Sequence, residues 1–210
     1  RISDLNEIES QALAKYFSSI GNNQLSDSLK QVLIKKYPVG MLSEEKFIST
    51  LSEKKDNEFM NLADIFIKQF PNSKQKTNII EKMVQYYITN QKYDRAESIM
   101  LQNKFVPPAS AIRLAFMYAE KLRDMPRAEA LLTKISNKIK SLSYADCPDN
   151  KSKYEWSSQN NDYLAEVYRA SGEFYLQNKN KEKSIENFIL AKATFREMPD
   201  KLYENIALAN

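Results

Sequence analysis

The stretch YITNQKYDRA, residues 87–96, decides the fold because it places a small residue shortly after a tyrosine and a polar turn. Two later stretches repeat the pattern, YAEKLRDMPRA at residues 118–128 and YLQNKNKEKS at residues 175–184. Ala96 and Ala128 are 32 residues apart, and Ser184 follows Ala128 after 56 residues, which leaves room for one period and a polar insertion. A period of about 34 residues with two helices per unit predicts stacked helical hairpins, which form a surface rather than a reaction centre.

The composition favours helices over sheets. Hydrophobic residues make up 42% of the 210-residue chain and charged residues 28%, which is ordinary for a soluble protein with a buried core. There are only three glycines, whereas tight turns between strands often need a positive φ angle. No strand-like alternation extends beyond a few residues, so we expect an all-α fold.

Apolar residues recur at helical spacing through most of the chain. We expect five hairpins and a trailing helix that Pro199 opens within residues 199–210. Residues 143–159 are polar and form the one long interruption. The helices are expected at residues 2–20, 26–37, 43–54, 57–70, 74–90, 93–103, 109–122, 126–142, 161–177 and 182–198, with Ser26 and Ser43 as N-caps.

Several kinds of chemistry are excluded by the residues that the chain lacks. It contains no histidine and one cysteine, so histidine-dependent nucleophile systems and an internal disulfide cannot form, and we expect no zinc site. Its scattered glycines form no phosphate-binding loop. We therefore expect no catalytic site, no cofactor and no metal, although an enzyme built from Asp, Glu, Lys and Tyr remains an alternative.

Charge and hydropathy bear on partners. The net charge is +4, and the 31 basic and 27 acidic residues are interleaved rather than gathered into a stripe, so we expect no nucleic-acid partner. No apolar run reaches the roughly 18 residues that span a bilayer. Arg1 stands where a methionine would begin a gene product, which suggests a processed or excised end, and the last helix reads as unfinished.

The repeats resemble the tetratricopeptide repeat family, in which small residues let two helices approach and large residues fill the space beside them. The resemblance covers about residues 73–198, with residues 1–72 as degenerate hairpins of one continuous solenoid. It implies a right-handed α-α superhelix; an irregular helical solenoid is the rival interpretation. The matching residues are Ile80, Met83, Tyr87, Ala96, Met100 and Pro108; Ile112, Ala115, Ala128 and Leu132; Tyr168, Gly172, Tyr175, Ser184, Phe188 and Ala191; and, more loosely, Leu13, Ala14, Phe17, Ser26, Leu33 and Pro38. In the second of these units Tyr118 falls one residue early.

The resemblance also implies a binding face, because the first helix of each pair lines the concave surface in that family. The positions exposed there correspond to Asn78, Glu81, Gln85 and Ile88; Ser110, Arg113, Met117 and Glu120; and Glu166, Arg169, Glu173 and Leu176. Arg113 and Arg169 occupy the same position in successive units, and guanidinium donors suit a carboxylate. The alternative is that both are ordinary surface arginines paired with Glu120 and Glu173. Met117 and Glu173 stand where the family's chaperone-binding clamp needs asparagine, so that clamp is not expected.

Two interpretations of the insertion remain open. Trp156 could anchor a partner, because a tryptophan ring offers a large contact area, or it could fold back to cover the helical stack. Cys147 could expose a reactive thiol in this polar loop, but no basic neighbour in sequence would lower its thiol pKa, so the favoured interpretation is an incidental cysteine.

These observations predict a non-catalytic scaffold that binds a protein or peptide, such as an acidic segment or a carboxylate terminus. The residues expected to contact it are Gln85, Arg113, Met117, Arg169, Glu173 and Trp156. The turns at residues 37–40 and 70–73 also resemble helical-repeat regions of bacterial envelope proteins, some of which precede a thioredoxin-like domain. The chain would then be a spacer beside such a domain, in the envelope; the cytoplasm is the other possible compartment.

Overall fold

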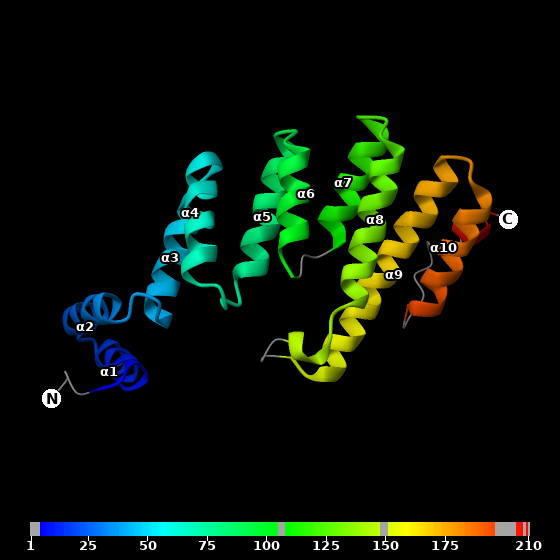
Figure 1. The fold of residues 1–210 in the computed structure, drawn as a ribbon. Coiled ribbons are helices and arrows are strands. Elements are labelled where there is room, and N and C mark those ends of the chain that lie inside the picture. Colours follow the sequence, from blue (N-terminus) through cyan, green and yellow to red (C-terminus); the bar gives the residue numbers. More distant parts are fainter. Residues whose placement is uncertain (1–4, 105–107, 148–150, 196–204, 208, 210) are drawn as a thin grey trace. The chain divides into compact units, whose positions relative to one another are not determined.

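The computed structural model describes residues 5–104, 108–147, 151–195, 205–207 and 209 (Figure 1). These residues form ten α-helices and the short 3-10 turn η2 (Tyr144–Asp146), with no β-strand among them. The prediction of an all-α fold with neighbouring helices packed in pairs is confirmed. The chain divides into two compact units, Arg1–Lys76 and Thr77–Asn210.

The first unit contains α1 (Glu7–Ser19), α2 (Asn23–Lys36), α3 (Met41–Glu53) and α4 (Asp56–Gln69). Its core is small: Ala14, Leu29 and Leu33 are buried between α1 and α2. Three phenylalanine rings pack against one another between α3 and α4, with centroids 5.1 to 6.0 Å apart. Such edge and tilted ring contacts stabilise beyond simple burial.

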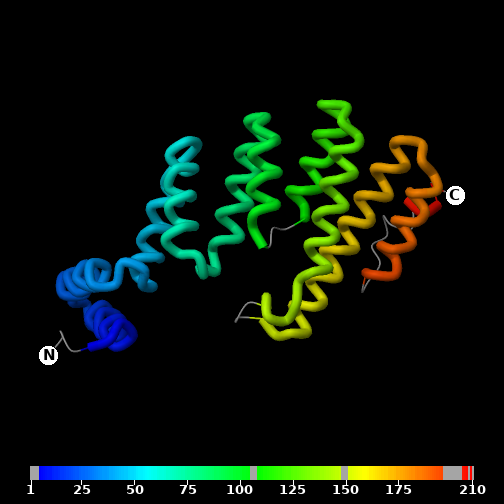
Figure 2. Tube along the Cα trace, viewed as in Figure 1, coloured from blue at the N-terminus to red at the C-terminus, as the bar shows by residue number. Residues whose placement is uncertain are grey.

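The second unit contains α5 (Lys76–Thr89), α6 (Tyr93–Gln102), α7 (Pro108–Glu120), α8 (Met125–Lys140), α9 (Lys153–Gln177) and α10 (Lys181–Thr194). The chain runs along one helix and back along the next within each pair (Figure 2). Leu114, Tyr118, Leu131, Phe174 and Phe188 are among its most deeply buried side chains.

The turns inside three helix pairs share one geometry. Gly21, Gln91 and Lys179 have φ angles of 79°, 57° and 58°, which is the left-handed region. The next amide donates back to the carbonyl oxygens of Phe17, Tyr87 and Tyr175 at 2.9, 2.8 and 2.9 Å, respectively. This six-residue closure is the Schellman motif, which ends a helix and reverses the chain.

The α7–α8 turn contains one extra residue. Arg123 takes the left-handed conformation with φ 54°, and the Asp124 amide donates to the Tyr118 carbonyl oxygen over six positions rather than five. The Leu122 amide donates to the Met117 carbonyl oxygen at 3.3 Å, so the helix end is locally wider. The extra residue explains why Tyr118 falls one position early in the repeat.

Small residues lie where the helices of a pair cross. Ala96 and Ala128 are fully buried. The Ser26 hydroxyl donates to the Ala14 carbonyl oxygen and the Ser184 hydroxyl to that of Gly172, both at 2.9 Å and both across twelve residues. A methyl group on Gly172 would overlap the Phe188 ring, so this helix pair approaches too closely for a side chain there.

The structure corrects three predicted helix starts. The α9 helix begins at Lys153, so residues 153–159 of the predicted insertion are helical. Ser152 caps it and pairs with Glu155 in a capping box, the S-x-x-E signal that starts many helices. Asn22 and Gly40, not Ser26 and Ser43, are the N-caps of α2 and α3.

The trailing helix is described only in part. Residues 205–207 and 209 are helical, while Pro199 and the other residues at 196–204 lie outside the described part of the chain. Ala209 is buried in a cluster with Tyr168, Phe188 and Ala191, so this segment packs on α9 and α10.

Among the described helices, none is both long enough and apolar enough to cross a lipid bilayer.

Candidate functional site

The first helices of the three pairs in the second unit, α5, α7 and α9, carry the predicted binding residues. Two of those residues meet between α5 and α7. The Gln85 amide nitrogen donates to the Ser110 hydroxyl at 2.8 Å, and Arg113 Nη1 donates to the Gln85 amide oxygen at 2.8 Å. Gln85 therefore holds the Arg113 guanidinium through a hydrogen bond whose acceptor carries no charge.

Arg113 keeps its charge available to solvent. Its residue surface is exposed, and within the described residues its guanidinium forms no ion pair. Met117 lies one turn further along α7 and is half-buried, so it offers a soft apolar surface beside the arginine. An exposed guanidinium beside an apolar side chain can bind a carboxylate together with a neighbouring apolar group.

Not every position carried over from the resemblance is exposed. Ser110 is fully buried and Ile88 is 4% exposed, so neither can contact a ligand in this conformation. Ser110 instead positions Gln85 by accepting a hydrogen bond from its side-chain amide.

Arg169 differs from Arg113 although both were predicted to bind a carboxylate. Its Nε and Nη2 donate to Glu166 at 3.0 and 2.8 Å, and Nη1 donates to Glu173 at 2.5 Å. Asn205 donates to the same Glu173 oxygen at 2.7 Å. Burial alone would lower the pKa of Arg169, but the two carboxylates raise it above its usual value. The charge of Arg169 is thus already matched by its own helix.

Trp156 lies inside the fold rather than on its surface. It is 4% exposed, and its indole nitrogen donates to the Ser143 carbonyl oxygen at 3.1 Å. The expectation that Trp156 contacts a partner is therefore corrected in favour of the alternative in which the ring covers the stack. A buried tryptophan commonly satisfies its N–H in this way.

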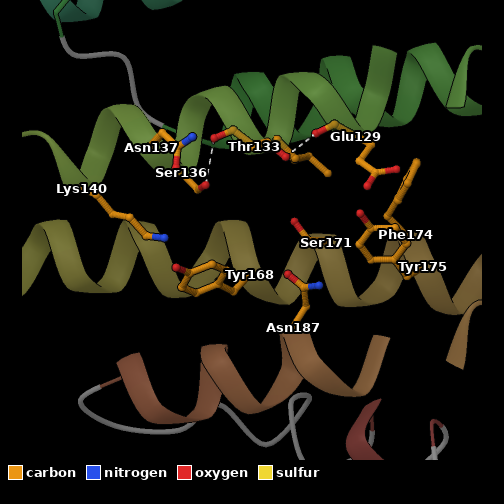
Figure 3. Close-up of a pocket in the computed structure, with 11 residues that line it drawn as sticks. Glu129, Thr133, Ser136, Asn137, Lys140, Tyr168, Ser171, Phe174, Tyr175 and Asn187 are labelled. Carbon is orange, nitrogen blue, oxygen red and sulfur yellow. Dashed lines mark hydrogen bonds between the residues drawn. The ribbon is translucent and has the colours of Figure 1, made fainter. Parts of the chain in front are cut away.

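The sequence analysis missed a pocket that lies between α8, α9 and α10. It has a volume of about 200 Å³ and opens between the side chains shown in Figure 3. The available signal was a polar stripe at helical spacing on α8, because residues i, i+4, i+8 and i+11 share one face. That stripe consists of Glu129, Thr133, Asn137 and Lys140.

Metal-binding geometry is absent from the part of the chain that the structure describes, where no three Cys, Asp or Glu side chains are grouped to hold an ion. No protein-family model, curated protein or solved structure matches this chain.

Proposed function

We propose that the second unit is a non-catalytic interaction module of the tetratricopeptide-like, right-handed α-α superhelix class. It binds an extended protein segment along the face formed by α5, α7 and α9. The Arg113 guanidinium contacts a carboxylate of that segment, either an acidic side chain or a chain terminus. The observation that carries the proposal is that Gln85 fixes Arg113 without neutralising it.

Repeated structural features support this class of fold. In each hairpin of the unit a basic side chain lies over the tyrosine that precedes the turn, namely Arg95 over Tyr87, Arg127 over Tyr118 and Lys183 over Tyr175. The distances to the ring centroids are 6.0, 4.3 and 5.0 Å. A cation held over a ring at each turn gives successive hairpins the same internal geometry.

The contrast between the two arginines refines the binding prediction. A ligand carboxylate at Arg169 would have to displace Glu166 or Glu173, whereas at Arg113 it displaces only water. We therefore assign carboxylate recognition to Arg113 and a supporting role to Arg169.

An immobilised peptide array tests the proposal with matched peptides that end in a free carboxylate or an amide. The full chain is expected to prefer acidic or free-carboxylate peptides, and Arg113→Ala is expected to remove that preference. Arg113→Lys should weaken it, because an ammonium group lacks the forked donor geometry. Lys121→Ala is the control, since Lys121 is exposed near the end of the same helix.

Two results would count against the module. One is a chain that binds no peptide of either kind. The other is an Arg113→Ala variant that is folded and keeps the full preference for carboxylates.

A further inference from the structure

The pocket between α8, α9 and α10 lies entirely within the second unit. The α9 helix forms its floor and supplies Tyr168 and Ser171, while α8 and α10 form the two sides (Figure 3). The buried rings of Tyr168 and Phe174 line it beside Leu132. A concave site with an apolar lining and a few polar groups is the usual form of a small-molecule site.

Hydrogen-bond acceptors dominate one end of the pocket. The hydroxyls of Thr133 and Ser171 donate to carbonyl oxygens of their own helices at 2.9 and 2.8 Å. The Asn187 amide nitrogen donates to the Lys183 carbonyl oxygen at 2.8 Å. The two hydroxyl donors are therefore used within their own helices and leave oxygen lone pairs for a ligand, whereas Asn187 keeps one N–H besides its amide oxygen. The carboxylate of Glu129 lies at the same end in Figure 3, but it already pairs with Lys183 and bonds Tyr175.

Hydrogen-bond donors lie at the opposite end. The Lys140 ammonium group sits 5.3 Å from the centroid of the Tyr168 ring, and both side chains appear together in Figure 3. Within the described residues Lys140 is exposed and forms no ion pair. The pocket thus offers a cation and a hydroxyl at one end and oxygen acceptors at the other.

The distance between the two ends of the pocket sets the length of a ligand that can contact both. Tyr168 and Ser171 are three residues apart on α9, and Thr133 and Lys140 are seven residues apart on α8. At a helical rise of 1.5 Å per residue these spacings correspond to roughly 5 to 10 Å along the pocket. A free α-amino acid, whose two charged groups are attached to the same carbon, is too short to reach both ends.

We propose that this pocket binds a short zwitterion of the size of a dipeptide. Its carboxylate contacts the Lys140 ammonium group and the Tyr168 hydroxyl. Its ammonium group donates to the oxygens of Thr133, Ser171 and Asn187. The site is independent of the carboxylate-binding face at Arg113, because it lies among α8, α9 and α10 and uses none of the same side chains.

Isothermal titration of the full chain with alanyl-alanine tests the site. Three comparison ligands separate the two charges: N-acetyl-alanyl-alanine lacks the ammonium group, alanyl-alanine amide lacks the carboxylate, and free alanine is too short. Each is expected to bind at least about fivefold more weakly than alanyl-alanine, because each loses one charge-assisted contact. Free alanine tests the spacing in particular.

Variants then tie binding to the pocket. Lys140→Gln is expected to raise the Kd for alanyl-alanine about five- to tenfold, while Lys192→Gln on α10 leaves it unchanged. Lys140 and Lys192 are both exposed, so neither change should disturb folding. Ser171→Ala removes an acceptor at the other end and should selectively weaken ligands that carry an ammonium group.

The proposal fails if alanyl-alanine does not bind. It also fails if all four ligands bind equally, because binding would then be non-specific. A third contrary result is a Lys140→Gln variant that binds alanyl-alanine as tightly as the unaltered chain does. A peptide-array result at Arg113 has no bearing on these outcomes, so the two proposals can fail separately.

Discussion

Two junctions between successive hairpins each combine an acid, the tyrosine before a turn and a base, but they differ in burial. At the α6–α7–α8 junction the residues are Glu97, Tyr118 and Arg127, and at the α8–α9–α10 junction they are Glu129, Tyr175 and Lys183. Each acid directly follows the small residue of one hairpin, and each base directly precedes that of the next. The acid side chain is 12% exposed at the first junction and 42% exposed at the second.

The buried junction is also more completely hydrogen-bonded. Glu97 accepts from the Tyr118 hydroxyl at 2.9 Å and from Arg127 Nε and Nη2 at 2.9 and 2.8 Å. Lys134 lies 3.6 Å from its other oxygen. Glu129 accepts from Lys183 at 2.9 Å and bonds Tyr175, but water reaches both charges. The comparison teaches that repeat position sets which groups meet, while burial sets how much their meeting stabilises the fold.

The largest expected effect is loss of the buried acid. Glu97→Gln replaces the buried carboxylate at Arg127 with a neutral amide and leaves the exposed Asp94 as its remaining acid, and we expect the free energy of unfolding to fall by about 2 kcal/mol. Glu129→Gln is the matched change at the exposed junction and should cost much less. Urea unfolding of both full-length variants measures the difference. Equal losses would show that burial does not separate the junctions.

Tyrosine hydroxyls give the next effect in size. The Tyr118 hydroxyl is fully buried and donates to Glu97, so Tyr118→Phe leaves one acceptor less satisfied and should cost about 1 kcal/mol. Tyr175 is half-buried, and water can replace its hydroxyl at Glu129. Tyr175→Phe should therefore be nearly neutral in the same urea experiment. A larger loss for Tyr175→Phe would reverse the ranking.

Much of this arrangement follows from the sequence, and the parts that do not have physical reasons. The tyrosine, turn and small-residue pattern predicted the helix pairs because close crossings demand small side chains. The burial of Trp156 depends on the Ser143 carbonyl oxygen, a tertiary contact that helical periodicity does not report. The early start of α9 is marked in the sequence by the Ser152 capping box, a local signal within a polar stretch that helical periodicity does not detect.

The spacing of charged residues in the sequence distinguishes Arg169, which is paired within its own helix, from Arg113, which is not. Arg169 has glutamates three residues before it and four residues after it, on the same helix face, where ion pairs form. The corresponding neighbours of Arg113 are Ser110 and Met117, which carry no charge. The hydrogen bond from Arg113 to Gln85 spans two hairpins, and only the fold could show it.

Alkaline titration compares the same two tyrosines in one protein. Burial, followed by the hydrogen bond to Glu129, raises the pKa of Tyr175 to about 12. Burial and the bond to Glu97 raise the pKa of Tyr118 further. A raised pKa in the folded state means that the stability is present below the unfolded value of about 10 and is lost as pH rises above it. Tyrosinate absorbance should show Tyr118 ionising last, and Tyr118→Phe should remove that final step.

The smallest expected effect is the dependence of each ion pair's contribution to stability on salt concentration. The exposed Lys183–Glu129 pair is screened by dissolved ions, so Lys183→Gln should lower stability slightly at low ionic strength and not at all in concentrated sodium chloride. In the pair between Arg127 and Glu97 the carboxylate is only 12% exposed and the arginine 34%, so the cost of Arg127→Gln should depend on salt less than the cost of Lys183→Gln. Urea unfolding at two salt concentrations distinguishes the cases. If the stability lost in Arg127→Gln depended on salt as strongly as that lost in Lys183→Gln, water would reach the first junction. The difference in burial between the two junctions would then be smaller than their geometry indicates.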